Sequence, residues 1–144
     1  MIIRNKKAAY EYFLLDSFVC GIVLVGSEIK SIRKGEASLV DSFCAFNGKE
    51  LFLNNANINQ YKFSNQFNHE PKRPRKLLLT KKELNKIKRK ITEKGLTIVP
   101  INMFVNKEGF CKVTISVAKG KKLYDKRESI KEKDIKRDLQ RDYK

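Results

Sequence analysis

The stretch Cys111-Lys-Val-Thr-Ile-Ser-Val-Ala118 decides the fold, because its side chains alternate between apolar and polar types. The apolar parity consists of Cys111, Val113, Ile115 and Val117, and the other parity, expected to face solvent, consists of Lys112, Thr114, Ser116 and Ala118. A period of two is typical of a β-strand with one buried face and one solvated face. The sequence therefore predicts a strand here, within a fold built mainly from antiparallel strands.

Strand character extends to three further segments, residues 10–25, 37–46 and 96–105, which are rich in aromatic and β-branched side chains. The second of these ends at Asn47-Gly48, which favours a two-residue hairpin turn, so residues 49–53 should return antiparallel. Pro100 lacks a backbone N–H group. We therefore expect its strand to lie at a sheet edge or to bulge at that point.

Two segments predict helices. Ser27 is a suitable cap for a short helix over residues 28–34, and Gly35 supplies a left-handed stop. The second helix begins with Thr80-Lys-Lys-Glu83, a pattern in which the Thr hydroxyl and the Glu carboxylate satisfy backbone N–H groups reciprocally. Its apolar stripe consists of Leu84, Ile87 and Ile91, and Gly95 should end it.

About six strands and two helices fall within residues 1–118, and a small closed or half-closed barrel buries that many short strands without open edges. Residues 61–75, which contain Pro71, Pro74 and the only histidine, His69, are expected to form a surface excursion. Residues 119–144 contain 11 Lys or Arg, 6 Asp or Glu and few apolar side chains. We predict a basic tail that is disordered alone and becomes helical on a partner.

The composition is that of a soluble, strongly basic protein. Its 144 residues suffice for one domain, and 32 Lys and Arg against 16 Asp and Glu give a formal net charge of +16. No apolar stretch has the length of a spanning helix or a signal peptide. Three cysteines are too few for a disulfide scaffold, which indicates a reducing, intracellular compartment. We expect polyanionic partners, with nucleic acid ahead of an anionic membrane.

The residues give little support to an enzyme or a metal site. The three cysteines are 24 and 67 residues apart, unlike the close ligand pairs of structural zinc sites. A catalytic triad would have to use His69, and no glycine-rich phosphate loop is present. We predict no catalytic residue, no metal and no cofactor. The enzymatic alternative is a nuclease that uses His69 with Asp41 or Glu70.

The basic character points to nucleic acid. Residues 72–90 contain 10 Lys or Arg and one acid, Glu83. Such a run is often only a solvated helix face, but the overall excess of +16 favours phosphate binding, which releases condensed counterions. Tyr61, Phe63 and Phe67 precede the run and can stack on bases, although core packing is the better interpretation for at least two of them.

A set of longer motifs spans nearly the whole chain. They are Asn5-Lys-Lys-Ala8 with Tyr12-Phe13; Gly21-Ile-Val-Leu24; Gly26-Ser-Glu-Ile-Lys-Ser-Ile-Arg33 with Gly35; Asp41-Ser42; Asn68-His-Glu-Pro71; Arg73; Arg75-Lys-Leu-Leu-Leu79; and Val117-Ala-Lys-Gly-Lys-Lys-Leu-Tyr-Asp-Lys-Arg127. With these motifs the chain resembles the small protein B family (SsrA-binding proteins), the transfer-messenger-RNA-binding factors of bacterial trans-translation. The last motif is the longest and the most specific.

The resemblance implies an OB-fold-like, six-stranded antiparallel barrel with flanking helices, and a role that is not enzymatic. Family members bind the tRNA-like domain of transfer-messenger RNA (tmRNA) and enter a stalled ribosome, where the tail occupies the empty mRNA path near the decoding centre of 16S rRNA. The incomplete peptide is then tagged for degradation. An elongation factor and alanyl-tRNA synthetase act on the same RNA. We therefore expect a monomer in the bacterial cytoplasm without a membrane partner.

The resemblance also implies individual contacts. For the tRNA-like domain it indicates Leu78 and Lys112, with Arg75 and Lys76 beside Leu78. We also predict contacts with the tRNA-like domain at the other basic or polar positions of the shared motifs, which are Asn5, Lys7, Lys30, Arg33, His69 and Arg73. For the decoding centre and the mRNA channel it indicates Gly120, Lys121, Lys122, Tyr124, Asp125, Lys126 and Arg127. The chain departs from the pattern at Val19, where many relatives carry Glu.

Charge alone leaves a second hypothesis open. A general ribosomal protein or RNA chaperone would also be strongly basic, and it would bind unrelated RNAs equally once the salt concentration is matched.

Overall fold

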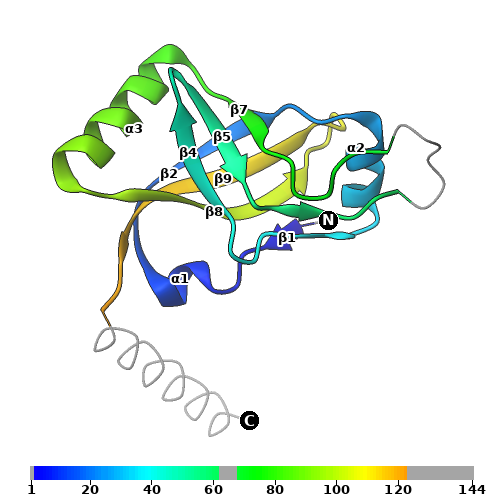
Figure 1. The fold of residues 1–144 in the computed structure, drawn as a ribbon, viewed down its shortest axis with the longest axis horizontal. Helices are drawn as coiled ribbons and strands as arrows, with labels where there is room; N and C mark the ends of the chain where they lie inside the picture. The colour runs from blue at the N-terminus through cyan, green and yellow to red at the C-terminus, as the bar shows by residue number, and fades with distance from the viewer. Residues whose placement is uncertain (1, 62–67, 123–144) are drawn as a thin grey trace, which may run out of the picture.

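The computed structural model describes residues 2–61 and 68–122 (Figure 1). In chain order, the elements are β1 (Ile2–Arg4), α1 (Ala8–Glu11), β2 (Tyr12–Ile22), α2 (Gly26–Arg33), β3 (Ala37–Ser38), β4 (Phe43–Asn47), β5 (Glu50–Asn54), β6 (Asn57–Ile58), β7 (Arg75–Leu78), α3 (Lys81–Lys94), β8 (Thr97–Val105) and β9 (Cys111–Gly120). Helices α2 and α3 lie at opposite ends of the strands (Figure 1).

Six strands close into a ring. They pair in the order β8-β4-β5-β7-β2-β9, the pairing of β9 with β8 completes the circle, and every pairing is antiparallel. Strand β1 adds to β8, and β3 pairs with β6 separately. The prediction of a mainly β, OB-fold-like barrel of six antiparallel strands with flanking helices is confirmed. Closure leaves the ring without open strand edges.

The core lies inside the ring. The apolar parity of β9 is buried as predicted, together with Leu51, Leu53 and Met103 from neighbouring strands. The parity expected to face solvent is not solvated throughout, because Ser116 is fully buried. Its hydroxyl donates to the backbone oxygen of Val117 at 3.1 Å, so the buried group is satisfied.

Two strand predictions need correction. The predicted strand over residues 37–46 is divided into β3 and β4, because the chain turns at Asp41, whose φ of 59° is left-handed. The hairpin turn is Gly48-Lys49, one residue later than predicted, since Asn47 still pairs with Glu50. Gly48 takes the positive φ of this turn, 65°.

At Pro100 the predicted bulge is confirmed. The register between β8 and β9 shifts between Pro100 and Asn102. The alternative of an edge position is wrong, because β8 pairs with β1, β4 and β9. Sequence patterns also missed β1, α1, β6 and the ring strand β7, each of four residues or fewer.

Both predicted helices are present. Helix α3 has the predicted capping box, with Glu83 N–H donating to Thr80 Oγ1 at 3.2 Å and Thr80 N–H donating to Glu83 Oε1 at 3.0 Å. Ile87 is fully buried on the predicted stripe. Ser27 was wrongly expected to cap α2, since the helix begins at Gly26, two residues earlier than predicted, and the Glu28 carboxylate accepts the N–H of Val25 instead, at 2.9 Å.

The barrel extends slightly beyond the predicted boundary at residue 118. Lys119 and Gly120 pair with Phe13 and Tyr12, so β9 continues through Gly120. The segment 123–144 of the predicted tail lies outside the described residues.

The capping box gives a first prediction. Thr80→Ala removes the hydroxyl that accepts from Glu83 N–H, so the free energy of unfolding should fall by about 1 kcal/mol. Thr92→Ala is the matched control, because Thr92 is exposed within the same helix, where Ala is the better helix former. Urea denaturation measures both variants. An equal loss for both would contradict the capping role.

Candidate nucleic-acid interface

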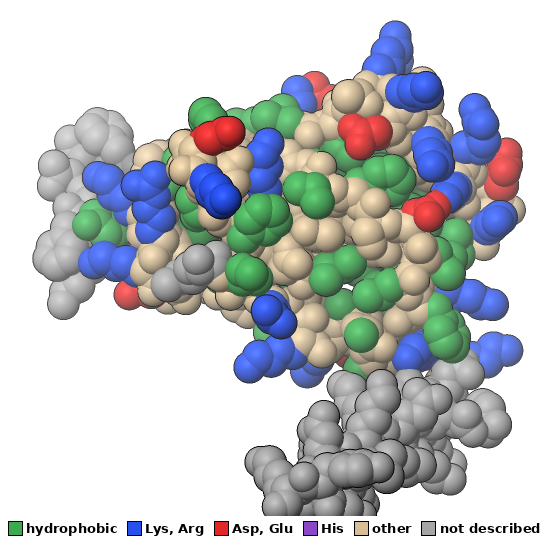
Figure 2. Space-filling view, turned by 180° about the vertical axis from the view of Figure 1, so that it is seen from behind, with side chains coloured by type: hydrophobic (Ala, Val, Ile, Leu, Met, Phe, Trp, Pro, Cys, Tyr) green, Lys and Arg blue, Asp and Glu red, His purple; other side chains and the backbone are tan. Residues whose placement is uncertain are grey.

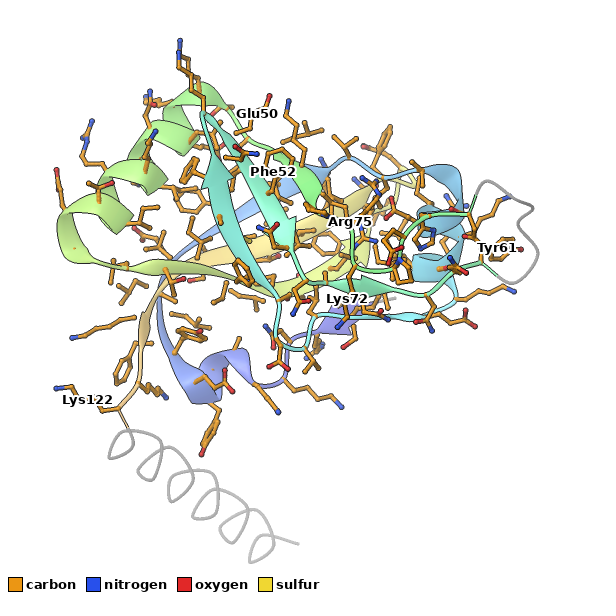
Figure 3. The ribbon with its side chains drawn as sticks, in the orientation of Figure 1. Glu50, Phe52, Tyr61, Lys72, Arg75 and Lys122 are labelled. Atoms are coloured by element: carbon orange, nitrogen blue, oxygen red, sulfur yellow. The ribbon has the colours of Figure 1, made fainter. Side chains whose placement is uncertain are left out.

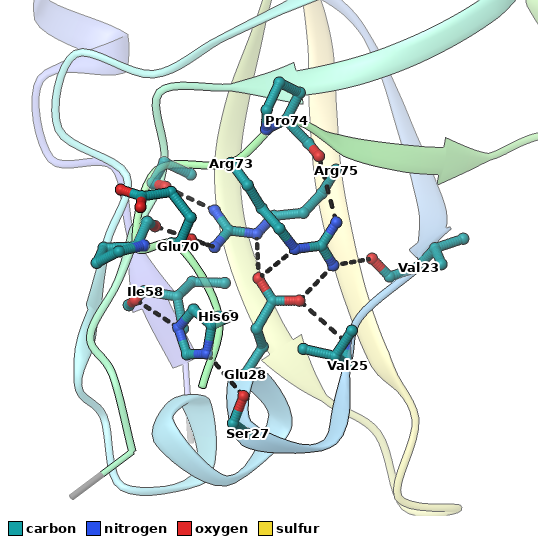
Figure 4. Close-up of polar contacts among 12 residues, drawn as sticks. Val23, Val25, Ser27, Glu28, Ile58, His69, Glu70, Arg73, Pro74 and Arg75 are labelled. Atoms are coloured by element: carbon teal, nitrogen blue, oxygen red, sulfur yellow. Dashed lines mark hydrogen bonds and ion pairs between the residues drawn. The ribbon is translucent and has the colours of Figure 1, made fainter. Parts of the chain in front are cut away.

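A buried carboxylate lies between two guanidinium groups where α2 meets β7 (Figure 4). Glu28 and Arg75 are both fully buried, and Arg75 Nε donates to Glu28 Oε2 at 2.6 Å. Arg73 binds the same carboxylate through its Nε, at 3.1 Å from Oε2, and through a close ion pair of its Nη2 with Oε1. One acidic side chain therefore joins the helix to Arg75, the first residue of β7, and to Arg73, two residues before it.

Arg75 also anchors the backbone around it. Its Nη1 donates to the carbonyl oxygen of Ala56 at 2.7 Å, and its Nη2 donates to that of Pro71 at 3.0 Å. These bonds distribute the donors of a fully buried guanidinium over acceptors from three chain segments, as a buried charge requires.

Burial of Glu28 and Arg75 disfavours their charged forms, whereas their hydrogen bonds and mutual attraction favour them. Desolvation alone would raise the pKa of Glu28, but the hydrogen bonds from Arg73, the Val25 backbone and Arg75 outweigh it, and the pKa is lowered. Desolvation also lowers the pKa of Arg75, against the stabilising charge and hydrogen bond of Glu28. The carboxylate is thus held ionised between its partners.

His69 belongs to the same buried region. Its Nε2 lies 2.8 Å from the carbonyl oxygen of Ile58, and its Nδ1 lies 2.8 Å from Ser27 Oγ. A carbonyl oxygen only accepts, so Nε2 donates. The expectation that all of residues 61–75 form a surface excursion is wrong for this part, because His69 and Arg75 are buried. A ring held in this way argues against the nuclease alternative.

The predicted contacts Leu78 and Lys112 lie on either side of Gly21 on the outside of the barrel. Gly21 of β2 pairs with Leu78 of β7 on one side and with Lys112 of β9 on the other. Leu78 is 52% exposed, and a Cβ added at Gly21 would lie 3.4 Å from Leu78 Cβ. We name Leu78, Gly21 and Lys112 the outer triplet.

A shallow hollow of about 180 Å³ adjoins the outer triplet and is also lined by Phe110. Gly21 and Phe110 were not predicted as site residues. A glycine inside a strand is a signal for close approach of a ligand or neighbour, and it was available in the sequence.

The outward row of β2 extends this surface. Phe13, Leu15 and Val19 of β2 are exposed, and so is Val23 directly after the strand. Val19, at the position where the resemblance implies Glu, is 59% exposed and shares a face with Gly21. Strands β2 and β9 lie behind β4 and β5 in Figure 1, and the view from behind shows hydrophobic side chains in its middle with Lys and Arg along its borders (Figure 2).

The other predicted body residues fall into separate places. Lys30 lies with its Nζ 5.3 Å from the centre of the Tyr61 ring, at the α2 end of the molecule (Figure 3). The guanidinium of Arg33 is near Gly109 in the turn before β9. Lys76 pairs with Glu50 at 3.0 Å on the surface.

Asn5 and Lys7 are not part of the outer triplet. Asn5 Nδ2 donates to the carbonyl oxygen of Pro100 at 2.9 Å, and both residues line a different cleft. The structure therefore brings together Leu78 and Lys112, with Arg33 at the neighbouring turn, and places Arg75 and His69 inside. The assignment of these residues to RNA binding stays a prediction.

The start of the predicted tail is attached to the body. Lys121 N–H donates to the backbone oxygen of Glu11 at 2.9 Å, and its Nζ lies 5.0 Å from the centre of the Phe13 ring. Gly120 and Lys122 are also described, and Lys122 lies at the end of the molecule away from Tyr61 (Figure 3). Tyr124, Asp125, Lys126 and Arg127 lie outside the described residues.

Within residues 2–61 and 68–122, no three His, Cys, Asp or Glu side chains form a group that could hold a metal ion. The three cysteines are buried and unpaired, and burial raises the pKa of Cys20 to about 12 and that of Cys111 to about 11. No helix in the same part of the chain combines the length and apolarity needed to span a membrane.

Comparison with known proteins identifies close relatives. The family model described as SmpB protein matches residues 2–144. An SsrA-binding protein of Flavobacterium johnsoniae is 54% identical over 139 residues, which are 96% of this chain and 92% of that protein. One of Bacteroides thetaiotaomicron is 53% identical over 142 residues, 99% of this chain and 95% of that protein.

A solved structure gives the same result in three dimensions. It is described as "tmRNA-SmpB: a journey to the center of the bacterial ribosome", and its matching chain superposes with a TM-score of 0.72 at 38% identity. The match covers 90% of this chain and 94% of that chain.

The buried carboxylate gives a prediction on stability. Glu28→Gln leaves Arg75 buried without its counter-charge, so the free energy of unfolding should fall by about 3–5 kcal/mol at pH 7. Glu50→Gln is the matched control, because its pair with Lys76 is exposed and worth about 0–1 kcal/mol. Urea titrations of both variants measure the difference, and similar losses would contradict a special role of the buried pair.

The pH dependence of the same variants gives another prediction. The folded-state pKa of Glu28 is lower than its unfolded value, so the unfolded state takes up the proton first as the pH falls. The stability advantage of the wild type over Glu28→Gln should be constant above the unfolded pKa of about 4.3 and shrink below it. Thermal unfolding between pH 3 and pH 7 measures this, and an advantage that persists unchanged in acid would contradict the lowered pKa.

Proposed function

The chain belongs to the SmpB protein family, and from that premise we propose that it binds tmRNA and acts with it on the bacterial ribosome in trans-translation. The observation that carries the proposal is the match over residues 2–144, with about half of the residues identical to SsrA-binding proteins. The protein is an RNA-binding factor in this role and not an enzyme. Its place of action, the ribosome, implies the cytoplasm.

We infer that the outer triplet contacts the tRNA-like domain. Lys112 supplies a cation for the phosphate backbone, and exposed Leu78 supplies an apolar contact for a ribose or a base. Gly21 between them has no side chain, and the Leu78 side chain packs over it, 3.4 Å from where a Cβ would lie. Arg33 at the neighbouring turn and Lys30 on α2 extend the positive charge.

Arg73, Arg75 and His69 act on RNA binding indirectly in this proposal. Their side chains are bonded to Glu28, Ser27 and backbone oxygens. They fix β7, which presents Leu78 three residues after Arg75. A firm strand face recognises the shape of folded RNA better than its sequence, because base edges in an A-form helix are poorly accessible.

The tail takes the second part of the function. In this proposal residues 120–127, with Gly120, Lys121 and Lys122 at their start, lie at the decoding centre and the following residues in the empty mRNA channel. The channel is lined by phosphate, so 11 cations between residues 119 and 144 supply attraction. An mRNA in the channel excludes the tail sterically, which makes binding specific for stalled ribosomes. The bonded start of the tail gives it a fixed origin on the barrel.

The body is tested with Lys112→Gln. Loss of one phosphate contact should weaken binding to the isolated tRNA-like domain and reduce the slope of log K against log salt by about 1. Lys49→Gln in the exposed hairpin turn is the matched control and should leave both quantities unchanged. Fluorescence anisotropy at several salt concentrations measures them. Equal slopes for Lys112→Gln and the wild type would remove Lys112 from the interface.

The tail is tested with the triple replacement of Asp125, Lys126 and Arg127 by Ala. Affinity for the tRNA-like domain should remain, because the barrel holds that site, whereas peptide tagging in a reconstituted translation system with a stop-less mRNA should be abolished. Replacement of Lys131 and Lys133 by Ala is the control, because it removes more net positive charge than the triple replacement does but leaves residues 125–127 unchanged. Loss of RNA affinity in the triple variant would contradict the division between barrel and tail.

A further inference from the structure

A cleft of about 340 Å³ opens at the end of the barrel where β2 and β8 begin. Its lining includes Lys7, Glu11, Tyr12, Asp41 and Phe43. The volume is at the lower end of the range of about 300–1,000 Å³ that small-molecule sites occupy. It therefore suits one nucleoside and not a nucleic-acid helix.

The cleft is distant from the outer triplet. Lys112 pairs with Phe104 of β8, while Thr97 and Val99 of β8 line the cleft. At a rise of 3.3 Å per residue the two places are about 20 Å apart along the strand. The cleft lies beside the origin of the tail instead, because Glu11, which lines it, accepts the N–H of Lys121 through its backbone oxygen.

The polar lining is mixed in charge. The carboxylates of Glu11 and Asp41 have no hydrogen bond or ion pair within residues 2–61 and 68–122, and exposed Lys7 lies with them in the lining. Two carboxylates without a partner in the described part of the chain disfavour a phosphate inside the cleft and favour a ligand that donates hydrogen bonds. Guanine is the standard base with two adjacent donors on its Watson–Crick edge, N1–H and N2–H, which match the two oxygens of one carboxylate.

Aromatic side chains and a fixed loop complete the site. Tyr12 and 46% exposed Phe43 lie in the lining, and such rings stack on unpaired bases. The loop at Asp41 is held by Asn55 Nδ2, which donates to the Asp41 backbone oxygen at 3.0 Å, and by Ser42 Oγ, which donates to Leu39 at 2.6 Å. The cleft is thus built before a ligand arrives.

We propose that this cleft binds one unpaired guanine of an RNA strand, with the Asp41 carboxylate on its Watson–Crick edge, an aromatic ring on its face and exposed Lys7 near the backbone of the strand outside the cleft. The proposal rests on the RNA-binding function given above. It assigns Asn5 and Lys7 to a site separate from the outer triplet.

The first experiment is an NMR titration of the full chain with the trinucleotides UGU, UAU and UUU. UGU should shift the amides of Ser42, Phe43 and Thr97 and leave that of Gly21 in place. Asp41→Asn keeps a residue type that tolerates the left-handed backbone but loses the carboxylate, and its preference for UGU over UAU should fall by about fivefold or more. Equal shifts with all three trinucleotides, no shift at the cleft, or an unchanged preference in Asp41→Asn would each overturn the proposal.

A second experiment distinguishes the source of the guanine. Affinities of Asp41→Asn are measured for the tRNA-like domain and for small ribosomal subunits without mRNA, with Lys112→Gln beside it. If Asp41→Asn loses affinity only for the subunits, the guanine belongs to ribosomal RNA. If it loses affinity only for the tRNA-like domain, the guanine belongs to tmRNA. If Asp41→Asn binds both RNAs as tightly as the wild type, while Lys112→Gln binds the tRNA-like domain more weakly, the cleft proposal fails and the proposed function stands.

Discussion

The fold depends on one constraint, which is that the carboxylate of Glu28 is buried and must remain ionised between two guanidinium groups. A buried charge without a partner costs several kcal/mol, so the chain has to bring α2, the 69–75 segment and β7 together before any of them is stable. Arg75 then fixes the start of the shortest strand of the ring. The position of Leu78 on the outside follows from this internal bond.

Strand β2 connects the two places where we propose that the protein contacts RNA. Its last residues, at Gly21, lie in the outer triplet, and its first residues pair with the end of β9, from which the tail leaves. One strand of 11 residues therefore sets the distance between the outer triplet and the tail origin. In the proposed function, that fixed distance suits a protein that holds one RNA while its tail enters a channel in another.

Local patterns were sufficient for much of the fold. The alternation of residues 111–118 and the capping box at Thr80 are short-range signals, and both predicted their elements correctly. The burial of Arg75 and His69 was not predictable, because their partners are 47 and 42 residues away in sequence and a basic or polar side chain is exposed by default. Arg75 and His69, which were predicted to contact RNA, are therefore buried and bonded to other parts of the chain. The pairing of Gly21 with both Leu78 and Lys112 likewise needed the sheet order.

The central claim is that the barrel recognises a tRNA-like RNA fold and not only negative charge. Competitive binding at an ionic strength of about 0.15 M tests it directly, with labelled tRNA-like domain displaced by unlabelled tRNA-like domain, by tRNA or by unstructured RNA of equal length. We expect the unlabelled tRNA-like domain to displace the label at far lower concentration than unstructured RNA does. Displacement at equal concentrations would show that charge accounts for the binding, and a general RNA chaperone would be the better description.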